Sequence, residues 1–172
     1  MKLHLGCGRN KKEGYLNCDV AKEVCPDKIV DLEKKLPFKD NCVEEIIIYH
    51  TLEHIRNFIG LMHELHRISK NKSLIKIKVP FYSSWGQYND PTHVRFFTPF
   101  TFNYFEGGDY SHEVGNRRFK VNKIKINFGV GRSSKLNCLF NPIINFNHSI
   151  YCRFFAWIFP SSERCFELEV IK

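Results

Sequence analysis

Short apolar stretches alternate with polar connections along the 172 residues of the chain. Alternation of apolar and polar positions within a stretch is typical of strands, and it predicts them at KLHLGC, GYLNCDV, DKIVDL, VEEIIIYH, SLIKIKVP, FKVNKIKINFG and CFELEVIK. From Leu52 to about Lys70, apolar residues recur at steps of three and four, which predicts a helix. Shorter helices are expected over 98–105 and from His148. Strands joined by connections that include one long helix indicate an α/β sheet.

The stretch LHLGCG places a glycine turn directly after the first strand. Gly6 and Gly8 allow the backbone to turn sharply and to approach a ligand closely, and ligands of open α/β sheets bind at the carboxyl ends of the strands. A dinucleotide-binding turn would have a third glycine where this chain has Lys11. Asp19 ends the second strand, where a carboxylate can bind the hydroxyls of a ribose. The pattern therefore favours a nucleoside ligand without a pyrophosphate over NAD.

Cysteine content and apolar runs limit the class of protein. The seven cysteines are odd in number and form no C-x-x-C pair, which predicts reduced thiols and a cytoplasmic protein without a signal peptide. No apolar run reaches the roughly 20 residues that a membrane-spanning helix needs. One domain is expected over 1–172, with a cofactor-binding part over 1–115 and a basic, Phe-rich part over 116–172 that completes the sheet.

The net charge of +8 is concentrated in the last third of the chain. Residues 116–172 contain 10 Lys and Arg but 3 Asp and Glu, and no acidic residue lies between Glu113 and Glu163. We expect this part to attract anions, or else to form the solvated edge of a strand. Its first basic residues are Arg117, Arg118, Lys120, Lys123, Lys125, Arg132 and Lys135.

Five stretches together carry a family resemblance: LHLGCG, GYLNCD, DLEKKLPFKDNCVEEIIIYHTLEHI, ELHRISKN and DPTHVRFFTP. As a set they resemble the small class I S-adenosylmethionine-dependent methyltransferases, in a compact form that lacks most of the N-terminal helices. The match spans about residues 2 to 100. The resemblance implies a Rossmann-like, seven-stranded, mostly parallel sheet with an antiparallel last strand and helices on both faces. It also implies S-adenosylmethionine as the methyl donor, with S-adenosylhomocysteine as the product.

The resemblance further implies roles for individual donor-binding residues. The turn of Gly6, Cys7 and Gly8 would approach the methionine part of the donor, and Asp19 would bind its ribose. Asp31 and Leu32 would lie around the adenine. His50, just after the fourth strand, would lie near the sulfonium.

Two histidines are the candidate catalytic residues. His50 and His93 are both expected at the donor's end of the sheet, and histidine titrates near neutral pH. Methyl transfer depends mainly on alignment, with a base needed where a hydroxyl must lose its proton. We expect His93 to be that base, oriented by Asp90; the alternatives are a solvated helix start for His50 and a loop-stabilising hydrogen bond for His93. No metal is predicted, because no carboxylate or cysteine pattern completes a site around the other histidines. Tyr82, Trp85 and Tyr88 are expected to face the substrate.

The methyl acceptor is less constrained than the donor. The stretch YHTL stands after the fourth strand in place of an N/D-P-P-Y motif, which argues against methylation of amino groups on nucleic-acid bases. Basic and Phe-rich residues near the C-terminus favour a sugar, a lipid-linked sugar or another small molecule, anionic ones included, handled near a membrane surface. RNA held by basic and aromatic groups, a protein acceptor, and a catalytically inactive binding module with the same fold are the alternatives. Peripheral membrane contact and nucleic-acid contact through the basic part both remain open.

Overall fold

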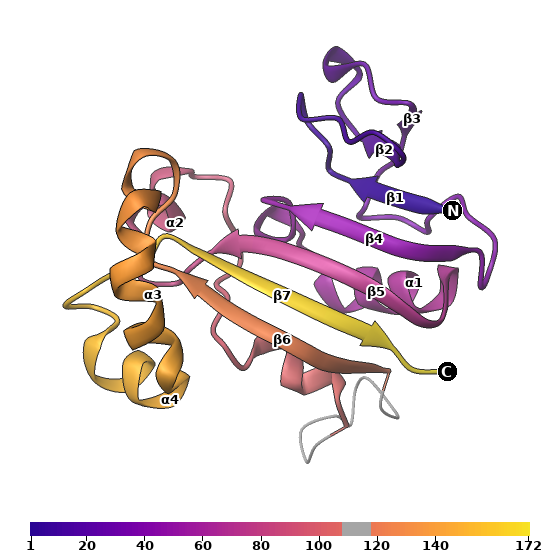
Figure 1. The fold of residues 1–172 in the computed structure, drawn as a ribbon. Coiled ribbons are helices and arrows are strands. Elements are labelled where there is room, and N and C mark those ends of the chain that lie inside the picture. The colour runs from indigo at the N-terminus through magenta and orange to yellow at the C-terminus, as the bar shows by residue number, and fades with distance from the viewer. Residues whose placement is uncertain (108–117) are drawn as a thin grey trace.

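A seven-stranded sheet forms the centre of the computed structural model, which describes residues 1–107 and 118–172 (Figure 1). The strands lie in the order β3-β2-β1-β4-β5-β7-β6, and all are parallel except β7, which is antiparallel to both of its neighbours. Their bounds are β1 Lys2–Leu5, β2 Leu16–Asp19, β3 Lys28–Ile29, β4 Val43–Tyr49, β5 Ser69–Pro80, β6 Phe119–Asn127 and β7 Glu163–Val170. The predicted sheet, mostly parallel with an antiparallel last strand, is thereby confirmed. Arg117 and the expected boundary between residues 115 and 116 lie outside the described residues.

The helices are short, and most of them lie beside or beyond the sheet's ends (Figure 1). The α-helices are α1 Phe58–Ile68, α2 Trp85–Asn89, α3 Asn137–Phe146 and α4 His148–Ile150. The 3-10 helices are Lys22–Val24, Leu52–His54, Thr101–Phe105 and Gly131–Leu136, and a π-helical turn spans Tyr151–Phe155. No helix among the described residues has the length and apolar character needed to cross a membrane.

Helix α1 begins later than its apolar periodicity predicts. The segment from Leu52 first makes one 3-10 turn, and the α-helix starts only at Phe58, because the side chain of Asn57 caps it by accepting a hydrogen bond from the Gly60 amide at 3.1 Å. The carboxylate of Glu33 also accepts a hydrogen bond from the Asn57 amide, at 2.9 Å. The break between turn and helix exposes His54 to the end of the sheet, where the site lies.

Alternation along the central strands gives the sheet two different faces. Ile75 and Ile77 of β5 are buried in the main core under α1, whereas Lys76 between them points to the opposite face and pairs with Glu45 of β4 at 2.7 Å. Lys2 pairs with the same carboxylate at 3.0 Å. The connection from β1 to β2 contains no helix, so this charged face near β1 has no helix from that connection over it.

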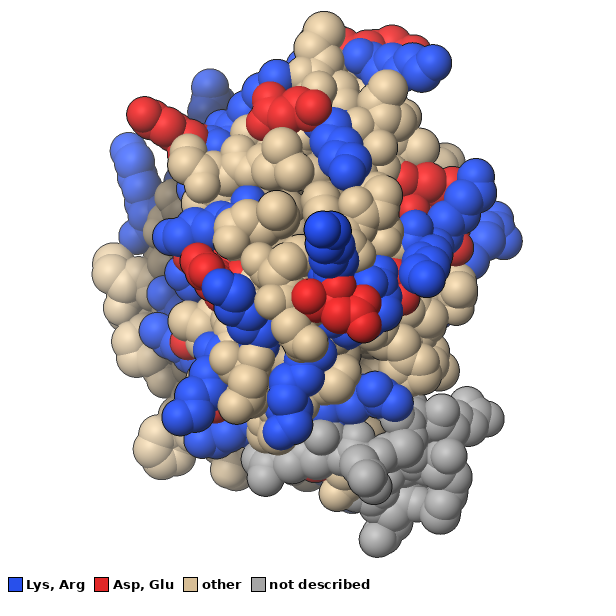
Figure 2. Space-filling view, turned by 90° about the vertical axis from the view of Figure 1, so that its right-hand side faces the viewer, with Lys and Arg blue, Asp and Glu red and all other residues tan. Residues whose placement is uncertain are grey.

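The two ends of the sheet differ in the segments that lie at them. Figure 2 shows the molecule from the end of the sheet at which the parallel strands begin. Lys, Arg, Asp and Glu side chains are intermingled there, and the pair of Lys70 and Glu44 is one example. At the opposite end, where the parallel strands finish, lie the glycine turn after β1 and helices α2 to α4 (Figure 1). Ligand-binding loops belong at this carboxyl end.

Candidate active site

The first pocket at the carboxyl end of the sheet contains most of the residues expected to hold the donor. It has a volume of about 400 Å³ and lies beyond strands β1, β2, β3 and β4. It is lined by Gly6, Gly8, Asp19, Val20, Val30, Asp31, Leu32, Glu33, His50, Thr51, His54 and Ile55. The fold therefore gathers residues from four separate chain segments into one cavity, and we refer to it below as the donor pocket.

The two glycines of the turn are required for different reasons. Gly6 has φ +66°, and a Cβ there would lie 2.1 Å from the Oγ1 atom of Thr51, which follows the neighbouring strand β4. Gly8 has φ +50°, but no atom lies within 4 Å of the position its Cβ would take. Close packing thus excludes a side chain at Gly6, whereas at Gly8 the space is open to the pocket.

Asp19 holds the turn in place. Its Oδ2 accepts a hydrogen bond from the Gly8 amide at 2.8 Å, and its Oδ1 accepts one from the Ala21 amide at 3.0 Å. Each carboxylate oxygen has further lone-pair capacity. The same side chain can therefore fix the backbone of the turn and still accept a hydrogen bond from a ligand in the pocket.

Asp31 and Cys7 differ in how they relate to the donor pocket. Asp31 lines it, accepts a hydrogen bond from the Glu33 amide at 3.0 Å and pairs with Lys34 at 3.0 Å; the Glu33 amide and then Lys34 lower the pKa of this carboxyl. Cys7 is only 2% exposed, and its side chain is not among those that line the pocket. Burial raises the pKa of its thiol. The expected contact of Cys7 with the donor is thus restricted to its backbone.

A second pocket adjoins the first and shares His50 and His54 with it. Its volume is about 350 Å³. It is lined by His50, Glu53, His54, Pro80, Ser84, Trp85, Gly86, Asp90, His93, Val130, Ser162 and Glu163. We call it the acceptor pocket, because it offers space next to the end of the donor pocket where His50 lies.

His50 forms the boundary between the two pockets and is held between two carboxylates. Its Nε2 lies 3.0 Å from Oε2 of Glu163, and its Nδ1 lies 3.6 Å from Oε1 of Glu53. The hydrogen bond to Glu163, followed by the interaction with the carboxylate of Glu53, raises the pKa of His50 to about 9. A histidine with this pKa is protonated at neutral pH, which favours a role for His50 as a cation between the two carboxylates.

His93 is oriented by a backbone carbonyl. Its Nδ1 lies 2.9 Å from the Gln87 carbonyl oxygen, which can only accept. Nδ1 therefore carries the proton in the neutral ring, and Nε2 is left with a free lone pair. Asp90, the expected partner, lies 3.8 Å from Nε2, beyond hydrogen-bond distance. The carbonyl of Gln87, and not Asp90, fixes the ring.

His54 stacks edge-on against His93, with ring centroids 4.8 Å apart. Its Nδ1 lies 2.9 Å from the hydroxyl of Thr92, and that hydroxyl donates its proton to Asp90 at 2.6 Å. Because the hydroxyl proton is already used, Nδ1 of His54 must be the donor in this pair. Asp90 therefore orients His54 through Thr92, a role that the sequence does not indicate.

Several residues of the site are not predicted from the sequence. Glu163 lies 113 residues from His50 and begins the last strand, and no local pattern links the two. Glu53 does have a local signal, because it lies in the stretch HTLEH between two histidines. Glu53, His54 and His93 each offer a possible metal-ligand atom, and these atoms lie within 4.8 Å of one another. No metal-ligand spacing in the sequence relates His93 to Glu53 and His54.

The aromatic residues expected to face the substrate divide into two groups. Trp85 lines the acceptor pocket and is 77% exposed. Tyr82 instead donates a hydrogen bond to the Cys152 carbonyl at 3.0 Å, and Tyr88 donates one to the Tyr82 carbonyl at 2.9 Å. Neither tyrosine lines the acceptor pocket, so of the three only Trp85 borders it.

Comparison with known proteins finds similar structures but no similar sequence. No protein-family model matches the sequence, and no curated protein matches it. Among solved structures, a SAM-dependent methyltransferase from Archaeoglobus fulgidus is similar with a TM-score of 0.66 and 20% identity, over 98% of this chain and 85% of that one. An S-adenosylmethionine-dependent methyltransferase from Mesorhizobium loti is similar with a TM-score of 0.61 and 10% identity, over 98% and 89%.

A further solved structure with the same architecture is a [4+2]-cyclase, SpnF, with a TM-score of 0.56 and 11% identity, over 99% of this chain and 75% of that one. These neighbours share a fold but are named for different reactions, so the reaction of this chain has to be argued from the residues of its site. At the level of architecture the result is clear: this chain has the Rossmann-like fold of the class I S-adenosylmethionine-dependent methyltransferases.

Proposed function

We propose that the chain is an S-adenosylmethionine-dependent methyltransferase that methylates a hydroxylated small molecule, with a sugar or lipid-linked sugar as the favoured class. The observation that supports it most directly is the meeting of the donor and acceptor pockets at His50 and His54. When bound, S-adenosylmethionine would supply a methyl carbon on a positively charged sulfur, which leaves with the bonding electron pair when a nucleophile attacks.

The residues of the donor pocket suit this ligand. The backbone of Gly6 and Gly8 would contact the methionine part, Asp19 the ribose, and Asp31 with Leu32 the adenine. At the reacting end, the two negative charges of Glu53 and Glu163 are balanced by the positive charges of His50 and Lys78.

The acceptor pocket suits a hydroxylated ligand. It offers side chains that can bond to hydroxyls, such as Ser84 and Glu163, and the exposed ring of Trp85, on which the apolar face of a sugar can stack. In the proposed reaction, Nε2 of His93 accepts the proton of the acceptor hydroxyl as that oxygen bonds to the methyl carbon. His50 stays protonated and holds the carboxylates of Glu53 and Glu163 in place.

Calorimetric titration with S-adenosylhomocysteine and, separately, with NAD tests the donor. Binding of the first ligand alone is expected, and Asp19→Ala should weaken it by about tenfold or more, because a charged hydrogen bond contributes about 1.5–3 kcal/mol. Glu23→Ala, an exposed change in the Lys22–Val24 turn, is the matched control. Absence of binding by folded protein would contradict the methyltransferase proposal and favour the inactive binding module.

Transfer of labelled methyl groups to a panel of glycans, glycolipids, proteins and RNA tests the acceptor class. With an accepted substrate, His93→Gln should slow a single turnover by about 10²–10⁴-fold. His63→Gln on α1, outside both pockets, should leave the rate unchanged. An unaltered rate in His93→Gln would remove His93 as the base, and labelling of RNA or protein alone would replace the proposed acceptor class.

A further inference from the structure

The segment between β6 and β7 exposes ten large apolar side chains. We define the apolar patch as the residues Leu136, Leu139, Ile143, Phe146, Ile150, Phe154, Phe155, Trp157, Ile158 and Phe159. Their exposure runs from 45% at Phe155 to 91% at Phe146. Clusters of this kind on a protein surface mark interaction sites, because leaving them in water is unfavourable.

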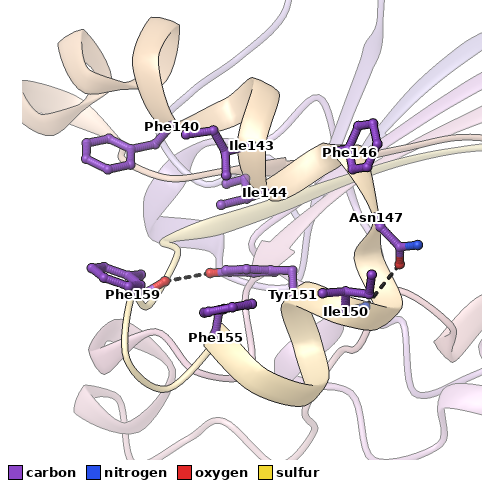
Figure 3. A pocket seen from close by; sticks show the side chains of 9 residues that line it. All are labelled: Phe140, Ile143, Ile144, Phe146, Asn147, Ile150, Tyr151, Phe155 and Phe159. Carbon is purple, nitrogen blue, oxygen red and sulfur yellow. Dashed lines mark hydrogen bonds between the residues drawn. The ribbon is translucent and has the colours of Figure 1, made fainter.

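The patch surrounds a groove of about 430 Å³ between two helical pieces (Figure 3). Ile143 and Ile144 of α3 form one wall, and Tyr151 and Phe155 of the π-helical turn form the other (Figure 3). Two polar side chains at the groove are bonded within the protein: the Tyr151 hydroxyl donates to the Phe159 carbonyl oxygen at 2.7 Å, and Oδ1 of Asn147 accepts from the Ile150 amide at 3.0 Å. What remains available at the surface is apolar.

The orientation of α3 explains why its apolar face points outward. Asn145 bonds to both the amide and the carbonyl of Ile126 on the edge strand β6, at 2.7 and 2.8 Å. Asn141 accepts a hydrogen bond from the Phe128 amide at 2.9 Å. With these asparagines, four residues apart, bound to the strand edge, the helix presents Ile143 to solvent, where it is 67% exposed.

Positive charge accompanies the patch. Arg132, Lys135 and Arg153 are exposed within the segment that carries it, exposed Lys125 lies near the end of β6 from which that segment departs, and no acidic residue occurs from 114 to 162. None of these four forms an ion pair within the parts of the chain that the structure describes. At the other end of the sheet, by contrast, basic and acidic side chains are intermingled (Figure 2).

We propose that the apolar patch and its flanking basic residues bind the surface of an anionic lipid bilayer. Phe and Trp side chains can enter the boundary between headgroups and acyl chains, while Lys and Arg bind the anionic headgroups. A second copy of this chain is a poorer occupant, because a symmetric contact would bring the same unpaired cations together. Free acidic proteins offer the charge but no apolar layer into which ten large side chains could insert.

The position of the patch connects it to the site. The segment that carries it leaves the sheet after Asn127 and returns at Glu163. Val130, near its start, and Ser162, at its end, both line the acceptor pocket. Docking of the patch would therefore place that pocket beside the bilayer. Membrane binding needs no methyl donor, so it can be tested whether or not the proposed reaction is correct.

Co-sedimentation of the whole protein with vesicles tests the proposal. Binding is expected to vesicles of phosphatidylcholine with about 30 mol% phosphatidylglycerol, to weaken with added salt, and to be much weaker to phosphatidylcholine alone. Phe154→Ser/Trp157→Ser should reduce the partition constant about tenfold or more. Arg132→Gln/Lys135→Gln should reduce it about 25-fold, at about fivefold for each charge near the surface.

Matched controls lie at the far side of the sheet. Ile29→Ser removes an apolar side chain of β3 that is 52% exposed, and Lys35→Gln/Lys39→Gln removes two exposed charges. Both should bind vesicles as the unaltered protein does, and circular dichroism checks that every variant is folded. The proposal would be overturned if the controls lost binding equally, or if the protein did not bind anionic vesicles. It would also be overturned if the protein bound RNA alone, or if it formed dimers that the Phe154→Ser/Trp157→Ser change dissociates.

Discussion

The imidazole of His50 lies 3.0 Å from the carboxylate of Glu163, although 113 residues separate them in the chain. His50 follows β4, and Glu163 begins β7. Because β7 is antiparallel, it begins at the end of the sheet where β4 finishes, and β5 alone separates the two strands. The contact joins the donor half of the site to the basic C-terminal part. It also fixes the charge at the boundary between the two pockets.

Removal of this contact should change the titration of His50. In Glu163→Gln, the pKa of His50 is expected to fall from about 9 toward its ordinary value of 6.5, because the largest cause of the raised pKa is lost. Histidine NMR signals followed against pH measure this. A wild-type His50 that titrates near 6.5 would contradict the interpretation.

The same pair predicts how stability depends on pH. A raised histidine pKa stabilises the folded state fully below the ordinary value of 6.5, and this contribution is lost as the pH rises through about 9. The difference in unfolding free energy between wild type and Glu163→Gln should therefore be larger at about pH 6 than at about pH 10. Urea unfolding at the two pH values checks it, and a difference that is independent of pH would argue against a charged pair.

The two glycines of the first turn should respond differently to alanine. Gly6→Ala is expected to destabilise the protein by more than about 2 kcal/mol, because backbone strain is added to a contact of 2.1 Å with Thr51. Gly8→Ala should cost about 1 kcal/mol, since only the backbone conformation is unfavourable, yet weaken S-adenosylhomocysteine binding by narrowing the pocket. Urea unfolding and calorimetry separate the two effects. The double variant Gly6→Ala/Thr51→Gly should recover the part of the loss that is due to the contact.

The asparagine that fastens α3 to the sheet should be important for stability. Asn145→Ala leaves the amide and the carbonyl of Ile126 without their partner, and we expect a loss of about 1–3 kcal/mol. Hydrogen exchange at the Ile126 amide should become faster in the variant. Asn122→Ala, which removes an exposed contact with Glu169 of β7, is the control and should change stability by less than about 0.5 kcal/mol.

Removal of divalent metals tests the prediction that no metal takes part. Protein treated with a chelator and dialysed should bind S-adenosylhomocysteine and transfer methyl groups at the original rate. Loss of activity that returns with a divalent cation would contradict this prediction. In that case Glu53, His54 and His93 would be the ligands to substitute first, because their candidate ligand atoms lie within 4.8 Å of one another.

The sequence by itself determined the sheet and predicted several residues that line the donor pocket. Alternation in VEEIIIYH and SLIKIKVP was sufficient to predict β4 and β5, because one face of these strands is buried and the other is charged. Gly6 and Asp19 were predicted because each lies at the end of its own strand, and parallel strands bring their carboxyl ends together. Asp31 was predicted from the family resemblance, and it lines the same pocket.

Other features were decided only by tertiary structure. The charge of His50 depends on Glu163, which no sequence spacing relates to it. The orientation of His93 depends on the carbonyl of Gln87, a backbone group that every residue has and that only the fold places. Helix α3 was not predicted, because its polar face bonds to a strand edge and its apolar face points to solvent. Periodicity shows that a segment has two faces, but only packing decides which of them is turned inward.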